Sequence, residues 1–258
     1  MDNKKIAVIG GGAAGLMASC RAAELGATVT VFERNDLLAM KLGITGKGRC
    51  NLTNSCSPEE FVRNVTQNGK FLFSAIHRFT PQDTIDYFEA LGVPLKVERG
   101  NRVFPVSDRA TDIVLALKNH MLDLGCKVIH ERVTALESEN DSITAVLTEK
   151  HRYAGFDSVI LCTGGVSYPV TGSTGDGFVI AKALGHTVTE LIPSLVGLTC
   201  AGDLCARMQG LTLKNIAIKI IDKEKNSVIY EDFGELLFTH FGVSGPVILS
   251  ASAHMRPM

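Results

Sequence analysis

The sequence predicts an α/β fold, in which a parallel β-sheet carries helices and a smaller β-rich module follows. The clearest indication is near the amino terminus, where the apolar run Lys5–Ile9 leads through glycines into the helix-forming stretch Ala13–Leu25. A second β-branched run, Thr28–Phe32, comes next, and this strand–helix–strand order is typical of parallel sheets. Beyond Pro193 apolar and polar residues alternate, which indicates antiparallel strands. We therefore predict two domains, at residues 1–193 and 194–258.

Between residues 35 and 124 we expect first a glycine-punctuated loop, at Asn35–Asn54, and then several helices and a hairpin. The glycine-rich stretch Asn35–Asn54 has no periodicity that favours a helix or a strand. Ser57-Pro58 and Thr80-Pro81 are each followed by acidic residues, a pattern typical of helix starts. A hairpin turn is expected at Gly100-Asn101, and a long helix is expected to begin at Ser107-Asp108 and reach about Leu124.

The remainder of the chain is expected to be rich in strands, with one further helix. Five runs of β-branched or alternating apolar residues predict strands: Cys126–Leu136, Ile143–Thr148, Ser158–Cys162, Leu213–Ile221 and Ser227–Tyr230. An apolar helix, Val247–Ala253, is expected after Gly245-Pro246 because proline favours the first helical position.

Composition and charge exclude several classes of protein. The chain has 26 Lys and Arg against 27 Asp and Glu, so nucleic-acid binding by counterion release is not expected. Apolar runs fall short of a membrane span, and the amino terminus resembles no signal peptide. The seven cysteines are scattered, which favours a reducing cytoplasm over a disulfide framework. Histidines and cysteines show no metal-ligand spacing, so we expect no metal.

A glycine motif between the first strand and the first helix predicts a dinucleotide site. Gly10, Gly12 and Gly15 fit the pattern G-x-G-x-x-G, which allows a tight turn, close approach of a diphosphate and close helix packing. Glu33 ends the second strand, where a carboxylate accepts hydrogen bonds from the ribose hydroxyls and repels a 2′-phosphate. Strand, helix and acid together favour a Rossmann-type site over a plain glycine turn.

Three stretches carry a resemblance to a known family. They are Gly46–Asn54 (Gly-Lys-Gly-Arg-Cys-Asn-Leu-Thr-Asn), Cys162–Gly177 and Phe238–Pro246. Together they resemble the BaiN-like flavoproteins, also described as the aminoacetone oxidase family of FAD-binding enzymes. The resemblance implies a glutathione-reductase-type FAD-binding Rossmann domain with a β-rich inserted domain, here partial. It also implies a later carboxyl-terminal segment that completes the flavin site, and we expect the 258-residue chain to lack this segment.

FAD is therefore the expected resident cofactor, with NAD(P)H as a transient electron donor. Arg49 is expected to pair with a phosphate oxygen, and Val133 to offer its backbone to adenine. Cys50 is equally consistent with a small buried filler, and Asp176 fits an acid in the first turn of a helix slightly better than a catalytic group. No catalytic residue is assigned. The expected cofactor contacts are Gly10, Gly12, Ala13, Ala14, Gly15, Glu33, Arg34, Lys41, Gly48, Arg49, Cys50, Asn51, Val133, Thr163, Gly164, Gly165 and Asp176.

The expected function is that of an FAD-dependent oxidoreductase with a small organic substrate and hydride transfer at flavin N5. The resemblance implies either reduction of an enone-like steroid acid or oxidation of a small amine, and the sequence does not choose between them. Two alternatives stay open: a pyridine nucleotide–disulfide reductase-like enzyme and a non-catalytic flavin-binding protein. Cys200 and Cys205 do not lie where disulfide reductases place their redox pair. The balanced charge disfavours RNA modification, so we expect neither a nucleic acid nor a membrane as partner, and the oligomeric state stays open.

Overall fold

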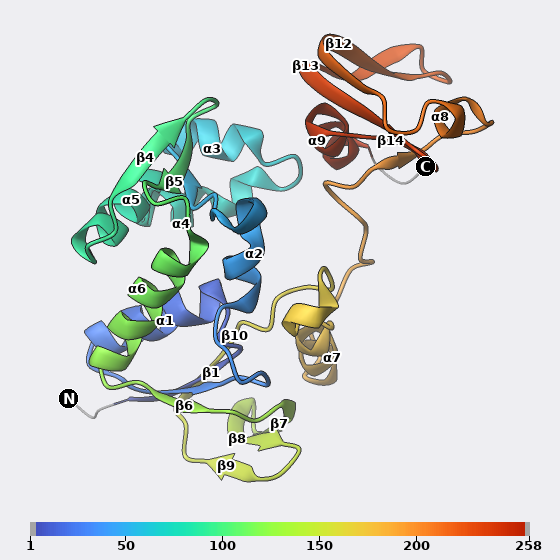
Figure 1. Ribbon diagram of the computed structural model, residues 1–258. Helices are drawn as coiled ribbons and strands as arrows, with labels where there is room; N and C mark the ends of the chain where they lie inside the picture. Colours follow the sequence, from blue (N-terminus) through green and yellow to red (C-terminus); the bar gives the residue numbers. More distant parts are fainter. Residues whose placement is uncertain (1–3, 256–258) are drawn as a thin grey trace. The chain divides into compact units, whose positions relative to one another are not determined.

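The computed structural model describes residues 4–255, and these divide into two compact units (Figure 1). The first unit comprises residues 4–63 and Lys70–Val188, and the second comprises Asn64–Gly69 and residues 189–255. The longer segment of the second unit begins after Val188, five residues before the predicted domain boundary at residue 193. Asn64–Gly69 falls within the first predicted domain.

A four-stranded parallel sheet forms the centre of the first unit. Its order is β10-β1-β2-β6, and every neighbouring pair is parallel. The strands are β1 (Lys5–Ile9), β2 (Thr28–Phe32), β6 (Lys127–Ile129) and β10 (Ser158–Leu161). Because β1 lies between two neighbours and is covered on both faces, its Ala7 and Val8 are fully buried. The α/β fold predicted from the amino-terminal residues is confirmed.

The two faces of this sheet are covered differently (Figure 1). Helices α1 (Ala13–Glu24) and α6 (Ala110–Asp123) pack on one face, where Leu16 and Ile113 share a core cluster with Val8. On the other face, Ala7 and Phe32 share a cluster with residues of an antiparallel sheet and of α7 (Asp176–Ala183). That sheet has the order β7-β8-β9, with β7 (Val133–Glu139), β8 (Ser142–Thr148) and β9 (Arg152–Ala154). The parallel sheet is therefore the middle of three layers.

A third sheet of the first unit carries the predicted hairpin. Its order is β3-β5-β4, with β3 (Thr53–Asn54), β4 (Leu95–Glu98) and β5 (Arg102–Pro105), and the turn lies at Gly100-Asn101 as predicted. The helical segments nearby in the chain are α3 (Pro58–Asn64), η1 (Gly69–Leu72), α4 (Phe73–Arg78) and α5 (Pro81–Ala90). Helix α5 begins with the expected capping box: the amide of Asp83 donates to Thr80 Oγ1, and the amide of Thr80 donates to the Asp83 carboxylate.

Two local predictions differ from the structure. The single strand predicted at Cys126–Leu136 is wrong, because the chain leaves the parallel sheet after β6 and re-enters a different sheet as β7. The stretch without periodicity, Asn35–Asn54, contains α2 (Met40–Gly48), whose backbone is non-helical at Thr45, Gly46 and Lys47. This interruption explains why residues of α2 show no helical spacing of apolar side chains.

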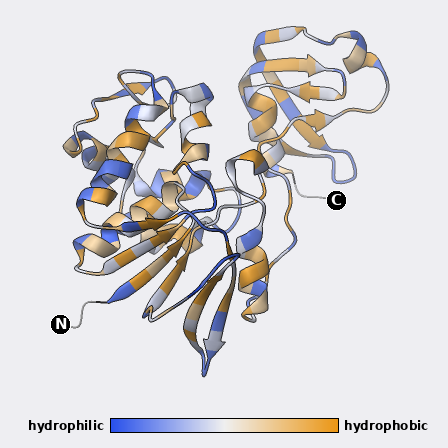
Figure 2. Cartoon of the chain, turned by 60° about the horizontal axis from the view of Figure 1, so that its bottom comes forward, coloured by the Kyte–Doolittle hydropathy of each residue, from blue (hydrophilic) through white to orange (hydrophobic). Residues whose placement is uncertain are grey.

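The second unit contains an antiparallel sheet of order β11-β14-β13-β12, as the alternation beyond Pro193 predicts. The strands are β11 (Leu198–Thr199), β12 (Thr212–Asp222), β13 (Ser227–Thr239) and β14 (Gly242–Ser244). Its helices are α8 (Leu204–Arg207) and α9 (Pro246–His254), and α9 packs on β13, where the rings of Tyr230 and His254 lie 4.7 Å apart. Across residues 4–255 no helix is long and apolar enough to cross a membrane, and Figure 2 shows hydrophilic residues interspersed along the helices.

Candidate functional site

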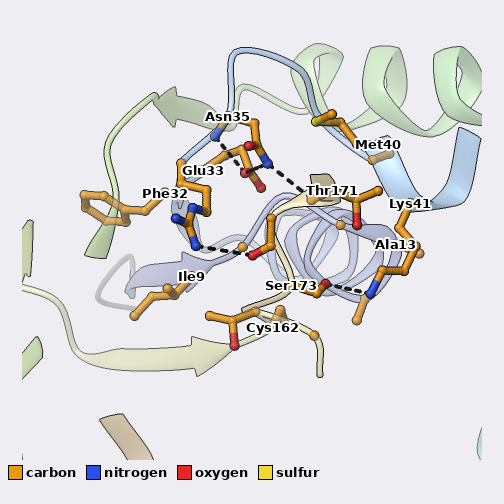
Figure 3. Close-up of a pocket in the computed structure, with 18 of the residues that line it drawn as sticks. Ile9, Ala13, Phe32, Glu33, Asn35, Met40, Lys41, Cys162, Thr171 and Ser173 are labelled. Atoms are coloured by element: carbon orange, nitrogen blue, oxygen red, sulfur yellow. Dashed lines mark hydrogen bonds between the residues drawn. The ribbon is translucent and has the colours of Figure 1, made fainter. Parts of the chain in front are cut away.

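A cavity of about 520 Å³ opens at the carboxyl ends of the parallel strands in the first unit (Figure 3). Ile9 and Gly10 line it at the end of β1, Glu33 follows the end of β2, and Cys162 follows the end of β10. Ligands of open parallel sheets bind at this edge, because helix amino termini and strand-end loops converge there. The cavity is therefore the candidate functional site of this unit.

The glycine turn at the floor of the cavity has the geometry that the motif predicts. Gly10 has a φ of 101°, and a Cβ at this position would collide with the carbonyl oxygen of Cys162. A Cβ on Gly15 would collide with the carbonyl oxygen of Gly10, so close packing of α1 on β1 requires glycine there. A Cβ on Gly12 would meet no atom within 4 Å, and Gly12 lines the cavity. The side of Gly12 is thus open to an approaching ligand.

Helix α1 begins directly behind this turn, at Ala13, and presents its amino terminus to the cavity. Ala13 and Ala14 line the cavity, and no side chain caps the first turn of the helix. The first N–H groups of a helix have no partner within the helix, and the helix dipole adds positive potential at that end. An anion such as a diphosphate is the natural ligand of this terminus.

Glu33 holds its carboxylate in a fixed orientation at the end of β2. The residue is 8% exposed, and its Oε2 accepts a hydrogen bond of 2.8 Å from the backbone N–H of Gly11. Its Oε1 accepts from the backbone N–H and from Nδ2 of Asn35, at 2.9 and 2.8 Å. These three donors fix both oxygens without supplying a countercharge, so the carboxylate keeps acceptor capacity for ribose hydroxyls.

Asp176 joins two arginines on the cavity wall. Its carboxylate accepts from Arg132 Nε at 2.9 Å and from Arg132 Nη2 at 3.1 Å. Arg34 Nη1 reaches the same carboxylate at 3.2 Å. The Arg132 guanidinium holds the pKa of the Asp176 carboxyl below its usual range, while Asp176 raises the pKa of Arg132. Both arginine charges at this wall are therefore engaged by one acid.

Lys41, in the first turn of α2, has a different environment. Its Nζ donates to the carbonyl oxygen of Ser167 and to Ser173 Oγ, each at 2.7 Å (Figure 3). Among the described residues that line the cavity, Arg34 and Arg132 are paired with Asp176, whereas the partners described for Lys41 are neutral oxygens. Its charge is available to an anionic ligand.

Most of the predicted cofactor contacts line this cavity. They are Gly10, Gly12, Ala13, Ala14, Glu33, Arg34, Lys41, Val133, Thr163, Gly164 and Asp176. Gly15, Gly48, Arg49, Cys50, Asn51 and Gly165 are not among the described residues that line it. For Gly15 the reason is its packing role; cofactor contacts by the other five residues stay predictions.

The Gly46–Asn51 segment is attached to the third sheet through Arg49. Arg49 Nε donates to Asp108 Oδ1 at 2.9 Å, and its Nη2 contacts both Asp108 and Glu98. The guanidinium also lies over the ring of Phe104, 4.2 Å from its centroid. Arg49 is thus engaged with carboxylates in this structure, and its predicted contact with a phosphate stays a prediction.

Cys50, the residue after Arg49, is fully buried and has a φ of 60°, a conformation uncommon for cysteine. Burial raises the pKa of its thiol, so the thiolate, which is the reactive form, is disfavoured. This environment matches the interpretation of Cys50 as a small buried filler, and contact of Cys50 with the cofactor stays a prediction.

Several lining residues were missed by the sequence analysis. Asn35 holds Glu33 and reaches the carbonyl oxygen of Thr171 at 3.4 Å (Figure 3). Its place directly after the strand-end pair Glu33-Arg34 is a signal that identifies it in hindsight. Ser173 lies within the stretch Cys162–Gly177 that carries the family resemblance, and Arg132 directly precedes Val133, so proximity to predicted contacts is the signal that could have identified both residues.

Comparisons with known proteins agree with this architecture. A family described as "HI0933-like protein Rossmann domain" matches residues 4–248. A 3-dehydro-bile acid delta(4,6)-reductase of Clostridium scindens is 30% identical over 97% of this chain and 60% of its own length. Ribosomal RNA dihydrouridine synthases of Haemophilus influenzae and Escherichia coli are 30% and 29% identical, over 97% and 100% of this chain and 61% and 62% of theirs.

The chain thus spans about 60% of the length of these curated relatives. The family match covers the whole first unit and most of the second. The resemblance to BaiN-like proteins that the sequence analysis identified is confirmed, and the chain belongs to the HI0933-like family of Rossmann-domain proteins.

Proposed function

We propose that this chain supplies the dinucleotide-binding part of an FAD-dependent oxidoreductase. The observation that carries the proposal is the position of the Glu33 carboxylate beside the uncapped amino terminus of α1, both on one cavity. A ribose acid and an anion site at the carboxyl edge of a parallel sheet are the two recognition elements that an adenosine diphosphate moiety requires.

The residues of the cavity fit FAD. The N–H groups around Gly12 and Ala13, together with the Lys41 ammonium, would hold the diphosphate, and Glu33 would accept from the ribose hydroxyls. The backbone at Val133 would border adenine, and Thr163-Gly164 after β10 would border the extended part of the cofactor. The bound flavin supplies hydride chemistry, while the protein binds it, orients it and excludes water.

We propose reduction of a carbon–carbon double bond conjugated to a carbonyl group as the reaction. The names of the three relatives have this chemistry in common, since a delta(4,6)-reductase and a dihydrouridine synthase both saturate such a bond. Reduction adds one hydride and one proton to the substrate, and with NAD(P)H as hydride source NAD(P)⁺ is released. The shared chemistry favours reduction over the amine oxidation that the sequence left open.

A small enone-like compound is the substrate class that we propose first, because the balanced charge of the chain does not favour nucleic acid. Uridine in ribosomal RNA is the second candidate, favoured by the names of two of the three relatives. The cytoplasm is the compartment that we propose, because a nicotinamide donor and scattered free thiols both fit a reducing environment.

The proposal is tested by the flavin content and the activity of the purified protein. We expect a version extended by the later carboxyl-terminal segment that the resemblance implies to be yellow and to release FAD on denaturation. We also expect it to oxidise NADH or NADPH anaerobically on addition of either a steroid enone or unmodified ribosomal RNA. Colourless protein that takes up NAD⁺ but not FAD would contradict the flavin assignment. Flavin that NAD(P)H reduces but that neither acceptor reoxidises would contradict the proposed reaction.

A further inference from the structure

The arginine that directly follows the ribose acid is held by a carboxylate on another element. Arg34 Nη1 donates to Thr174 Oγ1 at 2.7 Å and to Asp176 Oδ2 at 3.2 Å, and it lies 3.5 Å from the carbonyl oxygen of Gly172. All of these acceptors lie on the segment that leads into α7 or in its first residue. The Glu33 carboxylate, in contrast, accepts hydrogen bonds from Gly11 and Asn35. The acid that pairs with Arg34 is therefore Asp176 and not the adjacent Glu33.

The second arginine of this wall is held by the same acid. Arg132 makes two hydrogen bonds to Asp176 through Nε and Nη2, and its Nη1 reaches Glu149 at 3.3 Å. The side chains are only partly exposed: 29% for Arg34, 39% for Arg132 and 22% for Asp176. Thr174 Oγ1 also donates to Asp176 Oδ1 at 3.0 Å. The carboxylate thus has a fixed position with two cations around it.

An arginine close to the ribose acid has a known chemical consequence in Rossmann domains. A free arginine at this edge accommodates the 2′-phosphate of NADP, whereas an acid at the end of the second strand binds the 2′-hydroxyl. In this chain Glu33 is the acid, and Arg34 is the adjacent arginine. If Arg34 were free, its charge would offset the repulsion between the Glu33 carboxylate and a 2′-phosphate. Whether a 2′-phosphate is accepted therefore depends on where the Arg34 charge is held.

We propose that Asp176 is a specificity-determining residue of the dinucleotide site, which holds Arg34 and Arg132 as ion pairs and so excludes 2′-phosphorylated adenine nucleotides. A 2′-phosphate entering beside Glu33 would meet a carboxylate, and the two nearby guanidinium groups would have to leave Asp176 to compensate. A ligand with a free 2′-hydroxyl, such as FAD, requires no such rearrangement. The inference rests on the proposed function, because it needs the adenosine moiety at Glu33.

The test compares ADP-ribose with 2′-phospho-ADP-ribose by calorimetric titration of flavin-free protein. Wild-type protein is expected to favour ADP-ribose by about a hundredfold, and Asp176→Asn is expected to reduce this ratio by about tenfold, the weight of one charge-assisted hydrogen bond. Thr174→Val removes the 2.7 Å acceptor of Arg34 while it retains Asp176. Thr174→Val should also reduce the preference for ADP-ribose over 2′-phospho-ADP-ribose, but by a smaller factor. This variant can be measured even if Asp176→Asn does not fold.

Two further variants separate specificity from structure. Glu149→Gln removes a carboxylate from Arg132 but leaves Asp176 in place, so the ratio should stay at its wild-type value. Arg34→Ala and Arg132→Ala added to Asp176→Asn should abolish the gain in 2′-phospho-ADP-ribose affinity, because Asp176 holds both guanidinium groups. Equal weakening of both ligands by Asp176→Asn, or an unchanged ratio, would overturn the inference and leave the dinucleotide site intact. Wild-type protein that binds neither ADP-ribose nor FAD would overturn the proposed function and the inference with it.

Discussion

The backbone N–H of Gly11 donates a 2.8 Å hydrogen bond to Glu33 Oε2, and this bond joins the glycine turn after β1 to the end of β2. The two halves of the predicted dinucleotide motif are thus connected before any ligand is present. A ribose acid that is already oriented loses little conformational entropy when the ligand binds. The fold itself therefore fixes the position of the Glu33 carboxylate.

Replacement of Glu33 by alanine is expected to weaken FAD binding by about tenfold or more. The variant loses charge-assisted hydrogen bonds to the ribose, each worth about 1.5–3 kcal/mol. Fluorescence titration of flavin-free protein measures the effect. Because Asn35 and Gly11 also lose their acceptor, Glu33→Gln serves as the comparison that retains one oxygen. Unchanged affinity in both variants would refute the assignment.

Replacement of Lys41 by methionine is expected to weaken binding of ADP by about five- to tenfold. The described partners of the ammonium are neutral oxygens of Ser167 and Ser173, so its charge is available to the diphosphate. The loss should be larger at low ionic strength, since salt screens the interaction. Lys182→Met, on the exposed side of α7, is the matched control, and it should bind ADP as the wild type does. Equal affinities for Lys41→Met and its control would exclude Lys41 from the site.

Alanine at Gly15 should lower the stability of the fold, whereas alanine at Gly12 should lower the affinity for FAD. Gly15→Ala places a methyl group against the carbonyl oxygen of Gly10, so we expect a loss of about 1–3 kcal/mol in the free energy of unfolding. Gly12→Ala meets no protein atom within 4 Å, so the fold should tolerate it while FAD affinity falls, because the methyl group enters the cavity. Urea denaturation and flavin titration of both variants distinguish the two roles. A Gly12→Ala protein with normal affinity would place the diphosphate elsewhere.

Replacement of both Cys200 and Cys205 by serine is expected to leave flavin reduction and turnover unchanged. Both are free thiols of the second unit, and burial raises the pKa of Cys205, which disfavours the reactive thiolate. Stopped-flow measurement of flavin reduction by NAD(P)H checks this expectation. Loss of turnover in a folded double variant would favour the disulfide-reductase alternative.

Stability is expected to fall at acid pH partly through Asp176. Arg132 lowers the pKa of this carboxyl in the folded state, so the unfolded chain takes up its proton at a higher pH than the folded protein does. The stabilisation is therefore complete above the ordinary carboxyl pKa near 4 and is lost as pH falls through the folded-state value. Asp176→Asn should flatten the decline in unfolding free energy below about pH 4. A wild-type decline that persists in the variant would assign it to other acids.

The strand-end residues of the site were predictable because their roles are local. Gly10, Gly12 and Glu33 are set by the pattern strand–glycine turn–helix–strand, and the structure places all three on the cavity. Ser173 and Arg132 were not singled out, although Ser173 lies within the stretch Cys162–Gly177 that carries the family resemblance and Arg132 directly precedes Val133. The single strand predicted at Cys126–Leu136 is wrong for a different reason: the polar residues His130–Arg132 interrupt the apolar run at the point where the hydrogen-bonding partners change from one sheet to another, and the prediction passed over this interruption.

The assignment of Asn64–Gly69 to the second unit makes that unit discontinuous in sequence, since the chain belongs to the first unit on both sides of this segment. A single cut at residue 188 would release a carboxyl-terminal piece without these six residues. The unit therefore cannot be transplanted between relatives by exchanging one contiguous stretch of coding sequence. A chimera that keeps it whole must graft two stretches at once.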